Sequence, residues 1–148
     1  MTTDSPTLTL LRRALMAILV IGIVGTEAEL LLLKHTDGVW QLIPIVLNGL
    51  AIIALVWLGV ARNAAALRSL QGVMVLFLVS GGVGLVQHFI GNIGYARDSN
   101  PSLAGMELFR DAVMGSTPTL APGTMVQMAL VGFTFAFRHP LLTRRTNA

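Results

Sequence analysis

Four long apolar stretches dominate the chain of 148 residues, at about 10–33, 39–60, 70–90 and 120–137. Each is close to the ~20 residues that cross a hydrocarbon core of about 30 Å at a rise of about 1.5 Å per residue. The pattern predicts an all-α integral membrane protein. We expect a single membrane domain over 1–148, built as an antiparallel bundle of four transmembrane helices.

A short polar turn, Lys34 to Gly38, separates the first two stretches and predicts a helical hairpin. Asp37 is expected to cap the second helix through its side-chain oxygen. Trp40 and Trp57 stand 17 residues apart in that helix, a rise of about 25 Å that puts one ring near each membrane interface.

The long connection, 91–117, is the outer loop between the third and fourth helices. Within it, Leu103, Met106, Phe109 or Arg110, and Val113 recur at roughly helical spacing, and Gly115 follows as a stop signal. The loop is therefore predicted to contain a short amphipathic helix over 102–114, lying on the membrane surface or capping the bundle.

Composition agrees with a lipid environment, because 54% of the residues are hydrophobic and only 11% are charged. Cysteine is absent, which excludes disulfides, thiolate zinc sites, iron–sulfur clusters and cysteine nucleophiles. The net charge of +3 does not indicate a nucleic-acid partner, because its components divide between the two sides of the membrane.

Orientation follows from the Lys and Arg residues, which are more frequent in cytoplasmic segments. Seven belong to the termini and the second connection, against three on the opposite side. The seven are Arg12, Arg13, Arg62, Arg68, Arg138, Arg144 and Arg145, and the three are Lys34, Arg97 and Arg110. We expect a multi-pass protein of the inner (plasma) membrane with both termini in the cytoplasm.

The first stretch also resembles a signal peptide, since Arg12 and Arg13 precede an apolar run and Thr26-Glu27-Ala28 has small residues suited to cleavage. The apolar run then resumes through Leu30 to Leu33, whereas a cleaved segment is usually followed by a polar chain. We therefore expect an uncleaved first transmembrane helix.

Two carboxylates, Glu27 and Glu29, lie within the first stretch, where a charged side chain is costly. Being two residues apart, they point about 200° away from each other on a helix. Glu29 shares a face with Gly22 and Gly25, which permit close helix approach. Glu29 is thus expected in the bundle interior, while Glu27 reaches outer water or Lys34.

The third stretch carries one stripe of small and polar residues at intervals of three or four: Ser80 or Gly81, Gly84, His88, Gly91 or Asn92, continuing toward Tyr95. Such a stripe predicts a packing surface that holds His88 between helices rather than toward lipid. Gln87 and Asn92 are candidate hydrogen-bond partners for the imidazole.

Glu29, His88 and Glu107 form a candidate metal site in the outer half, with Glu27, His35 and Asn92 as candidate partners in a polar network. Mixed nitrogen and oxygen ligands suit a transition metal, and a histidine beside a carboxylate can also relay a proton. Haem is disfavoured, because His35 occupies a polar turn and His139 lies on the other side.

No serine-hydrolase elbow or phosphate-binding glycine loop occurs, so the sequence favours a non-enzymatic role. The favoured function is an accessory or interaction subunit that meets a membrane-protein partner, or a second copy, through its outer loop. A metal-binding or proton-handling redox-associated protein and a small oligomeric channel are the alternatives.

Overall fold

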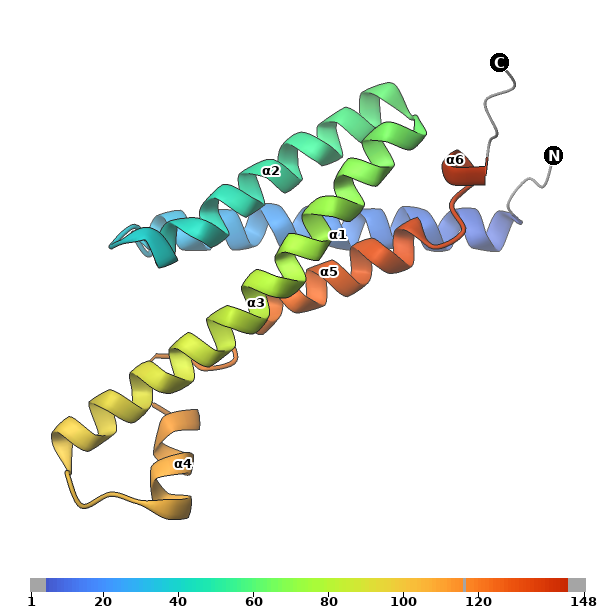
Figure 1. The fold of residues 1–148 in the computed structure, drawn as a ribbon. Coiled ribbons are helices and arrows are strands. Elements are labelled where there is room, and N and C mark those ends of the chain that lie inside the picture. The colour runs from blue at the N-terminus through green and yellow to red at the C-terminus, as the bar shows by residue number, and fades with distance from the viewer. Residues whose placement is uncertain (1–4, 116, 144–148) are drawn as a thin grey trace. The chain divides into compact units, whose positions relative to one another are not determined.

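The computed structural model describes residues 5–115 and 117–143, and every regular element in these ranges is a helix. The elements are α1 (Pro6–Leu32), α2 (Val39–Ala61), α3 (Ala64–Ser99), α4 (Gly105–Val113), α5 (Gly123–Ala136) and α6 (Pro140–Thr143) (Figure 1). Contacts divide the chain into two compact units, unit 1 (Met1–Phe77 and Met128–Ala148) and unit 2 (Leu78–Gln127). Helices α3 and α5 contribute residues to both.

In unit 1, α1 and α2 form the expected hairpin. The α1 helix begins with Pro6 in its first turn, where a missing amide costs nothing, and the Ser5 hydroxyl accepts from the Leu8 amide at 3.2 Å. The predicted Asp37 cap is wrong: Gly38 is the N-cap of α2, with a φ of 100°. Instead, the Asp37 amide donates to the Gln41 side-chain oxygen at 2.9 Å.

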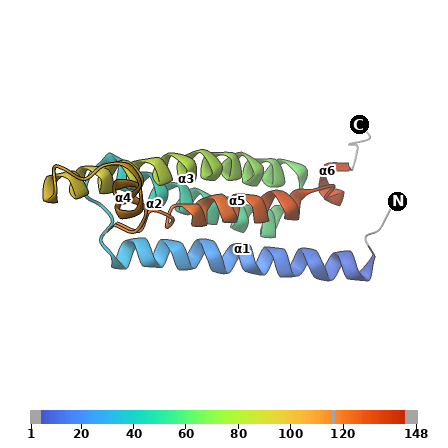
Figure 2. The ribbon, with the colours of Figure 1, turned by 90° about the horizontal axis from the view of Figure 1, so that it is seen from below.

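The core of unit 1 forms where α1 and α3 meet the last two-thirds of α5 (Figure 2). Leu19 of α1 and Met74 of α3 are fully buried. A Cβ atom added to Gly132 would lie 2.5 Å from the Met74 sulfur and 3.7 Å from Leu19, and one added to Gly22 would meet Met128. Glycine at these two positions therefore allows α5 to approach its neighbours closely.

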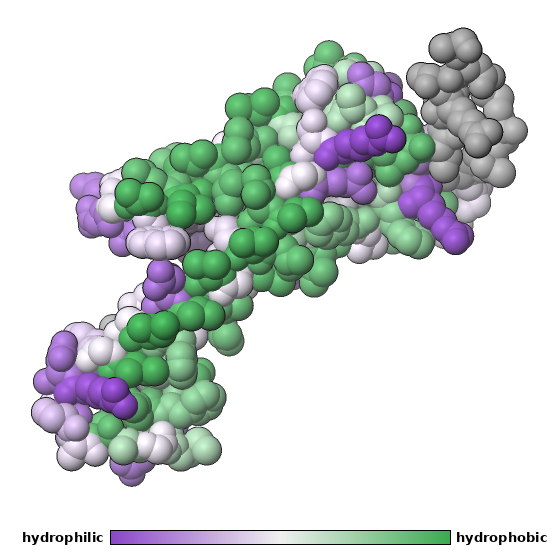
Figure 3. Space-filling view, in the orientation of Figure 1, coloured by the Kyte–Doolittle hydropathy of each residue, from purple (hydrophilic) through white to green (hydrophobic). Residues whose placement is uncertain are grey.

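Three helices, α1, α2 and α3, are long and apolar enough to cross a membrane. Their exposed faces carry large apolar side chains, which cover the visible face of α2 in Figure 3. The fourth predicted span differs, because α5 has 14 residues, or about 21 Å. Hydrogen-bonded turns from Pro118 to Met125 lead into it.

In unit 2, α3 continues well past the predicted end at about residue 90. It has 36 residues in all, about 54 Å, which exceeds a hydrocarbon core of about 30 Å. The sequence predicts that a connection begins at Gly91, but neither Gly91 nor Gly94 has a positive φ and the helix continues through both. The outer loop is therefore partly helical from its beginning.

The predicted amphipathic helix is present as α4, which lies beside the end of α3 in Figure 1. Its packing face differs from the expected one. Leu108 and Ala112 are buried, whereas Met106 is 78% exposed and Phe109 is 55% exposed. The Phe109 ring is tilted against Phe89 of α3, with ring centroids 5.8 Å apart, so α4 packs on α3 while part of its apolar surface stays outside.

Candidate functional site

The candidate metal ligands belong to different units, Glu29 to unit 1 and His88 and Glu107 to unit 2. Their candidate network partners are divided in the same way, with Glu27 and His35 in unit 1 and Asn92 in unit 2. Within either unit, the described residues contain no group of three His, Asp or Glu side chains close enough to hold an ion. The metal site that combines Glu29, His88 and Glu107 stays a prediction.

The two glutamates of α1 have exchanged their expected environments. Glu29 is exposed, and Glu27 is half-buried. The Glu27 Oε2 atom is fully buried and has no hydrogen-bond partner in the described part of the chain. The expectation that Glu29 is the interior residue rested on the glycine face, but Gly25 of that face has no neighbour within 4 Å. That half of the glycine face does not pack.

The stripe on α3 is confirmed as a packing surface within unit 2. A Cβ atom added to Gly81 would lie 2.9 Å from the Pro122 carbonyl oxygen, and one added to Gly84 would lie 2.7 Å from the Pro122 ring. Gly82, which follows Gly81 but faces another side of the helix, differs from both, since a Cβ atom added to it would meet nothing within 4 Å. Only the stripe side of α3 receives the returning chain.

His88 continues the stripe, and its Nδ1 atom is 2.9 Å from the Pro118 carbonyl oxygen. Because a carbonyl only accepts, Nδ1 carries the proton and donates. The partner is thus a backbone group of the segment before α5, rather than Gln87 or Asn92 as expected. This bond fixes the ring orientation and directs Nε2 away from Pro118.

Asn92 is the centre of the polar structure in unit 2 and is 2% exposed. Its Nδ2 atom lies 2.9 Å from the Ala112 oxygen, 2.8 Å from the Thr117 oxygen and 3.0 Å from the Thr119 hydroxyl. Its Oδ1 atom accepts from the Thr117 amide at 3.2 Å. One buried amide therefore ties the end of α4 and the following chain to α3, and both of its polar atoms are satisfied.

Gly115 is required by this arrangement for a steric reason. A Cβ atom at residue 115 would lie 2.6 Å from the Asn92 Cγ atom and 2.8 Å from its amide nitrogen. The sequence indicated Gly115 as the stop signal of a helix. Its position against Asn92 gives it a second role, since the side chain of any larger residue would displace the Asn92 amide from its hydrogen-bonded position.

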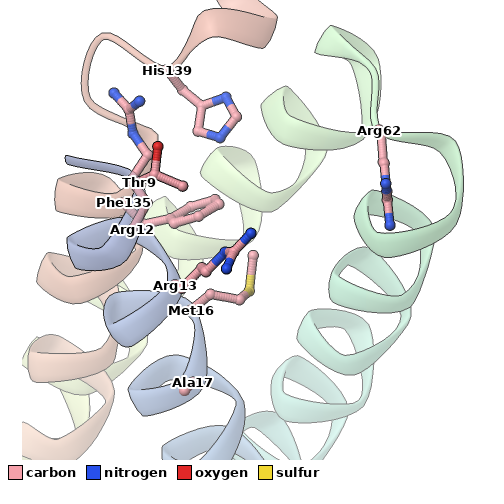
Figure 4. Close-up of a pocket in the computed structure, with 8 residues that line it drawn as sticks. All are labelled: Thr9, Arg12, Arg13, Met16, Ala17, Arg62, Phe135 and His139. Carbon is pink, nitrogen blue, oxygen red and sulfur yellow. The ribbon is translucent and has the colours of Figure 1, made fainter. Parts of the chain in front are cut away.

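Unit 1 holds a pocket of about 510 Å³ that the sequence did not predict. Three arginines and a histidine line it, namely Arg12, Arg13, Arg62 and His139 (Figure 4). In the sequence these arginines served only to set orientation. Together with His139 they come from three separate segments, which the hairpin and the return of α5 bring to one pocket. The one sequence signal was the density of cationic residues at these chain segments.

Comparison with known proteins adds no further information about this site: no protein-family model, curated protein or solved structure matches the chain.

Proposed function

We propose that the chain is an accessory subunit of the inner membrane that contacts another membrane protein through its outer segment, 91–117. In this proposal four helices cross the bilayer and both termini are cytoplasmic. The positive-inside distribution of Lys and Arg supports this orientation. The turns from Pro118 onward support a fourth span, since they add apolar length before the short α5 helix.

The observation that carries the proposal is the order of the outer segment in combination with its exposed side chains. Asn92 holds the chain on either side of Gly115 through hydrogen bonds, of which those to Ala112 and Thr119 are buried. Met106 and Phe109 nevertheless remain largely exposed on α4. A rigid surface loses little conformational entropy on binding, so preorganisation of this kind favours recognition of a partner.

The charge of α4 favours a protein over a lipid surface as its partner. Helices that lie on membranes are usually rich in Lys and Arg, which attract anionic lipids. The α4 helix instead has Glu107 and Asp111 against the single Arg110, a net charge of −2 + 1 = −1. Charged side chains around exposed Met and Phe resemble the polar rim and apolar centre of a protein interface. The excess of acid also disfavours a second copy of the same face.

Site-specific photo-crosslinking in intact cells tests this proposal. A photoreactive phenylalanine analogue replaces Phe109 or Met106 in the full chain, and the adducts are separated by mass. We expect a discrete adduct with one heterologous membrane protein from both positions. The same analogue in place of Arg97, which is exposed on α3, is the positional control and should give less adduct.

Two background variants distinguish a specific surface from incidental proximity. Asn92→Ala should abolish the adduct at Phe109 while the chain is still inserted, and Asn100→Ala, at an exposed position, should retain it. Glu107→Lys should weaken it. Adducts with lipid or with a second copy alone, or an adduct indifferent to Asn92→Ala, would contradict the accessory-subunit proposal.

A further inference from the structure

The pocket in unit 1 combines cationic and apolar walls. Arg12 and Arg13 enter from α1, Arg62 from the end of α2, and His139 from the turn after α5 (Figure 4). Met16 and Ala17, one turn further along α1, and the buried Phe135 supply apolar surface. A site with this composition suits a molecule that has both an anionic and an apolar part.

The arginines differ in how far the protein itself satisfies them. The Arg12 guanidinium is buried and donates to the carbonyl oxygens of Phe137 and Arg138 at 3.2 and 3.1 Å, so it holds the chain at the end of α5. Arg13 is exposed and makes no hydrogen bond or ion pair with the described residues. The Arg62 Nε atom donates to the Gly59 carbonyl oxygen at 3.2 Å, which leaves the two terminal nitrogens of the guanidinium for a ligand.

Protein carboxylates are scarce in the segments that build this pocket. The sequence contains no Asp or Glu in residues 5–26, 38–97 or 112–148, and these ranges include every residue that lines the pocket. Arginine side chains that line one pocket repel one another unless an anion lies between them. Guanidinium groups also match phosphate oxygens geometrically, because their donors form a planar fork.

We propose that this pocket binds a phosphate group, and that the phosphate is the headgroup of an anionic phospholipid. The apolar wall of Met16, Ala17 and Phe135 favours the lipid over free phosphate, because it offers a surface for the glycerol and upper acyl region. Basic pockets at the cytoplasmic ends of transmembrane helices are suited to such headgroups. In this site Arg13 and Arg62 bind the phosphate, while Arg12 positions the wall that carries His139.

The geometry of His139 agrees with a role as a donor to the same anion. Its Nδ1 atom accepts from the Leu141 amide at 3.2 Å, so the neutral ring carries its proton on Nε2. The ring also packs against Phe135, with centroids 5.1 Å apart. The side chain is thereby held at the pocket wall with one N–H group available.

Native mass spectrometry of the full chain, released from nanodiscs of defined lipid, tests the proposal. We expect phosphatidylglycerol to remain bound and phosphatidylcholine to be lost. Arg13→Gln and Arg62→Gln should each reduce the apparent affinity for phosphatidylglycerol about tenfold, the effect of one charged hydrogen bond. The matched control is Arg68→Gln, because Arg68 is an exposed arginine near the start of α3 that does not line the pocket, and it should change the affinity less than twofold.

Further variants and a competition experiment distinguish a lipid headgroup from free phosphate and a forked hydrogen-bond geometry from charge alone. Arg13→Lys and Arg62→Lys keep the charge and test the forked geometry; they should bind more strongly than the Gln variants and more weakly than wild type. Inorganic phosphate that competes at millimolar concentration, with the same dependence on Arg13 and Arg62, would support the phosphate site but assign it to the free anion. Equal losses from Arg68→Gln and Arg13→Gln, or equal retention of both lipids, would overturn the proposal.

Discussion

The two polar centres of this molecule, Asn92 in unit 2 and the arginine pocket in unit 1, differ in how far the protein itself hydrogen-bonds their side chains. In unit 2, Asn92 is buried and every polar atom of its amide is bonded to the chain around it. In unit 1, Arg13 and Arg62 line an open pocket, and Arg13 has no polar partner in the described chain. A polar group that the protein satisfies itself specifies the fold, whereas a charge that it leaves unsatisfied is suited to a ligand.

The largest expected loss of stability is that of Asn92→Leu, because leucine cannot hydrogen-bond to Ala112, Thr117 or Thr119. The buried Ala112 oxygen and Thr119 hydroxyl and the part-buried Thr117 amide and carbonyl each lose a hydrogen bond, so we expect α4 and the following chain to be destabilised by about 3 kcal/mol. Trypsin cleavage after Arg110, within α4, measures this opening directly. Asn100→Ala is the control, since the Asn100 side chain accepts only from the exposed Ser102 among the described residues, just after the end of α3. An unchanged cleavage rate would mean that Asn92 does not hold the outer segment.

Gly81→Ala should give the next largest loss of stability, and it tests the part of the α3 stripe that precedes Asn92 in the sequence. The new methyl group would press on the Pro122 carbonyl and on the backbone of Val126, neither of which moves cheaply, so we expect a loss of about 2 kcal/mol. Gly82→Ala adds its methyl to open space and should stabilise the helix by about 0.5 to 1 kcal/mol. Thermal unfolding in detergent compares the two, and equal effects would contradict the close approach.

Gly115→Ala should have a smaller effect, about 1 kcal/mol, because the displaced Asn92 amide retains some of its bonds. Hydrogen exchange at the Thr117 amide, which donates to Asn92, is the appropriate measurement and should accelerate. Gly94→Ala provides the matched control, as a Cβ at residue 94 has no neighbour within 4 Å. If both variants exchange alike, the steric role of Gly115 is wrong.

The smallest effect concerns pH and the pocket in unit 1. Burial, followed by the positive charge of Arg12, lowers the pKa of His139 from its ordinary value of 6.5. The unfolded chain therefore binds this proton more readily, so the stabilisation is fully present above pH 6.5 and is lost as pH falls through the folded pKa.

We expect thermal stability, followed by the fluorescence of Trp40 and Trp57 in unit 1, to fall modestly between pH 7.5 and pH 5. His139→Gln should flatten this pH dependence, whereas His35→Gln should preserve it. Phosphatidylglycerol should reduce this loss of stability at low pH, because an anion in the pocket lined by Arg12, Arg13 and Arg62 favours the protonated ring of His139. A pH dependence that survives His139→Gln would assign it to another group.

Much of the fold was predictable because membrane helices are specified by local sequence. The hairpin of α1 and α2, the stripe of α3 and the existence of α4 all followed from apolar length and spacing. The end of α3 was not predictable in this way, since glycine and polar residues after 90 are compatible with both helix and loop. The packing of α3 and the following chain decides between them.

The candidate sites were harder to predict, because they depend on contacts between distant residues. His88 and Asn92 were identified as polar residues of a packing stripe, but their partners, mostly backbone groups, lie up to 30 residues away. The environments of Glu27 and Glu29 were reversed, since helical geometry separates their faces without saying which face is covered. The shared pocket of Arg13, Arg62 and His139 has only one signal in the sequence, the density of cationic residues in those segments, and this signal does not say that the segments meet.

Hydrogen exchange in nanodiscs of phosphatidylcholine or phosphatidylglycerol tests the contrast between the two centres most directly. The predicted result is that amides 137–142, beside the arginine pocket, exchange at least several-fold more slowly in phosphatidylglycerol. The amides of Ala112, Thr117 and Thr119, the residues to which Asn92 is hydrogen-bonded, should exchange equally slowly in both lipids. Equal exchange of 137–142 in the two lipids, or lipid-dependent exchange of those three amides, would contradict the assignment of one centre to the fold and the other to a ligand.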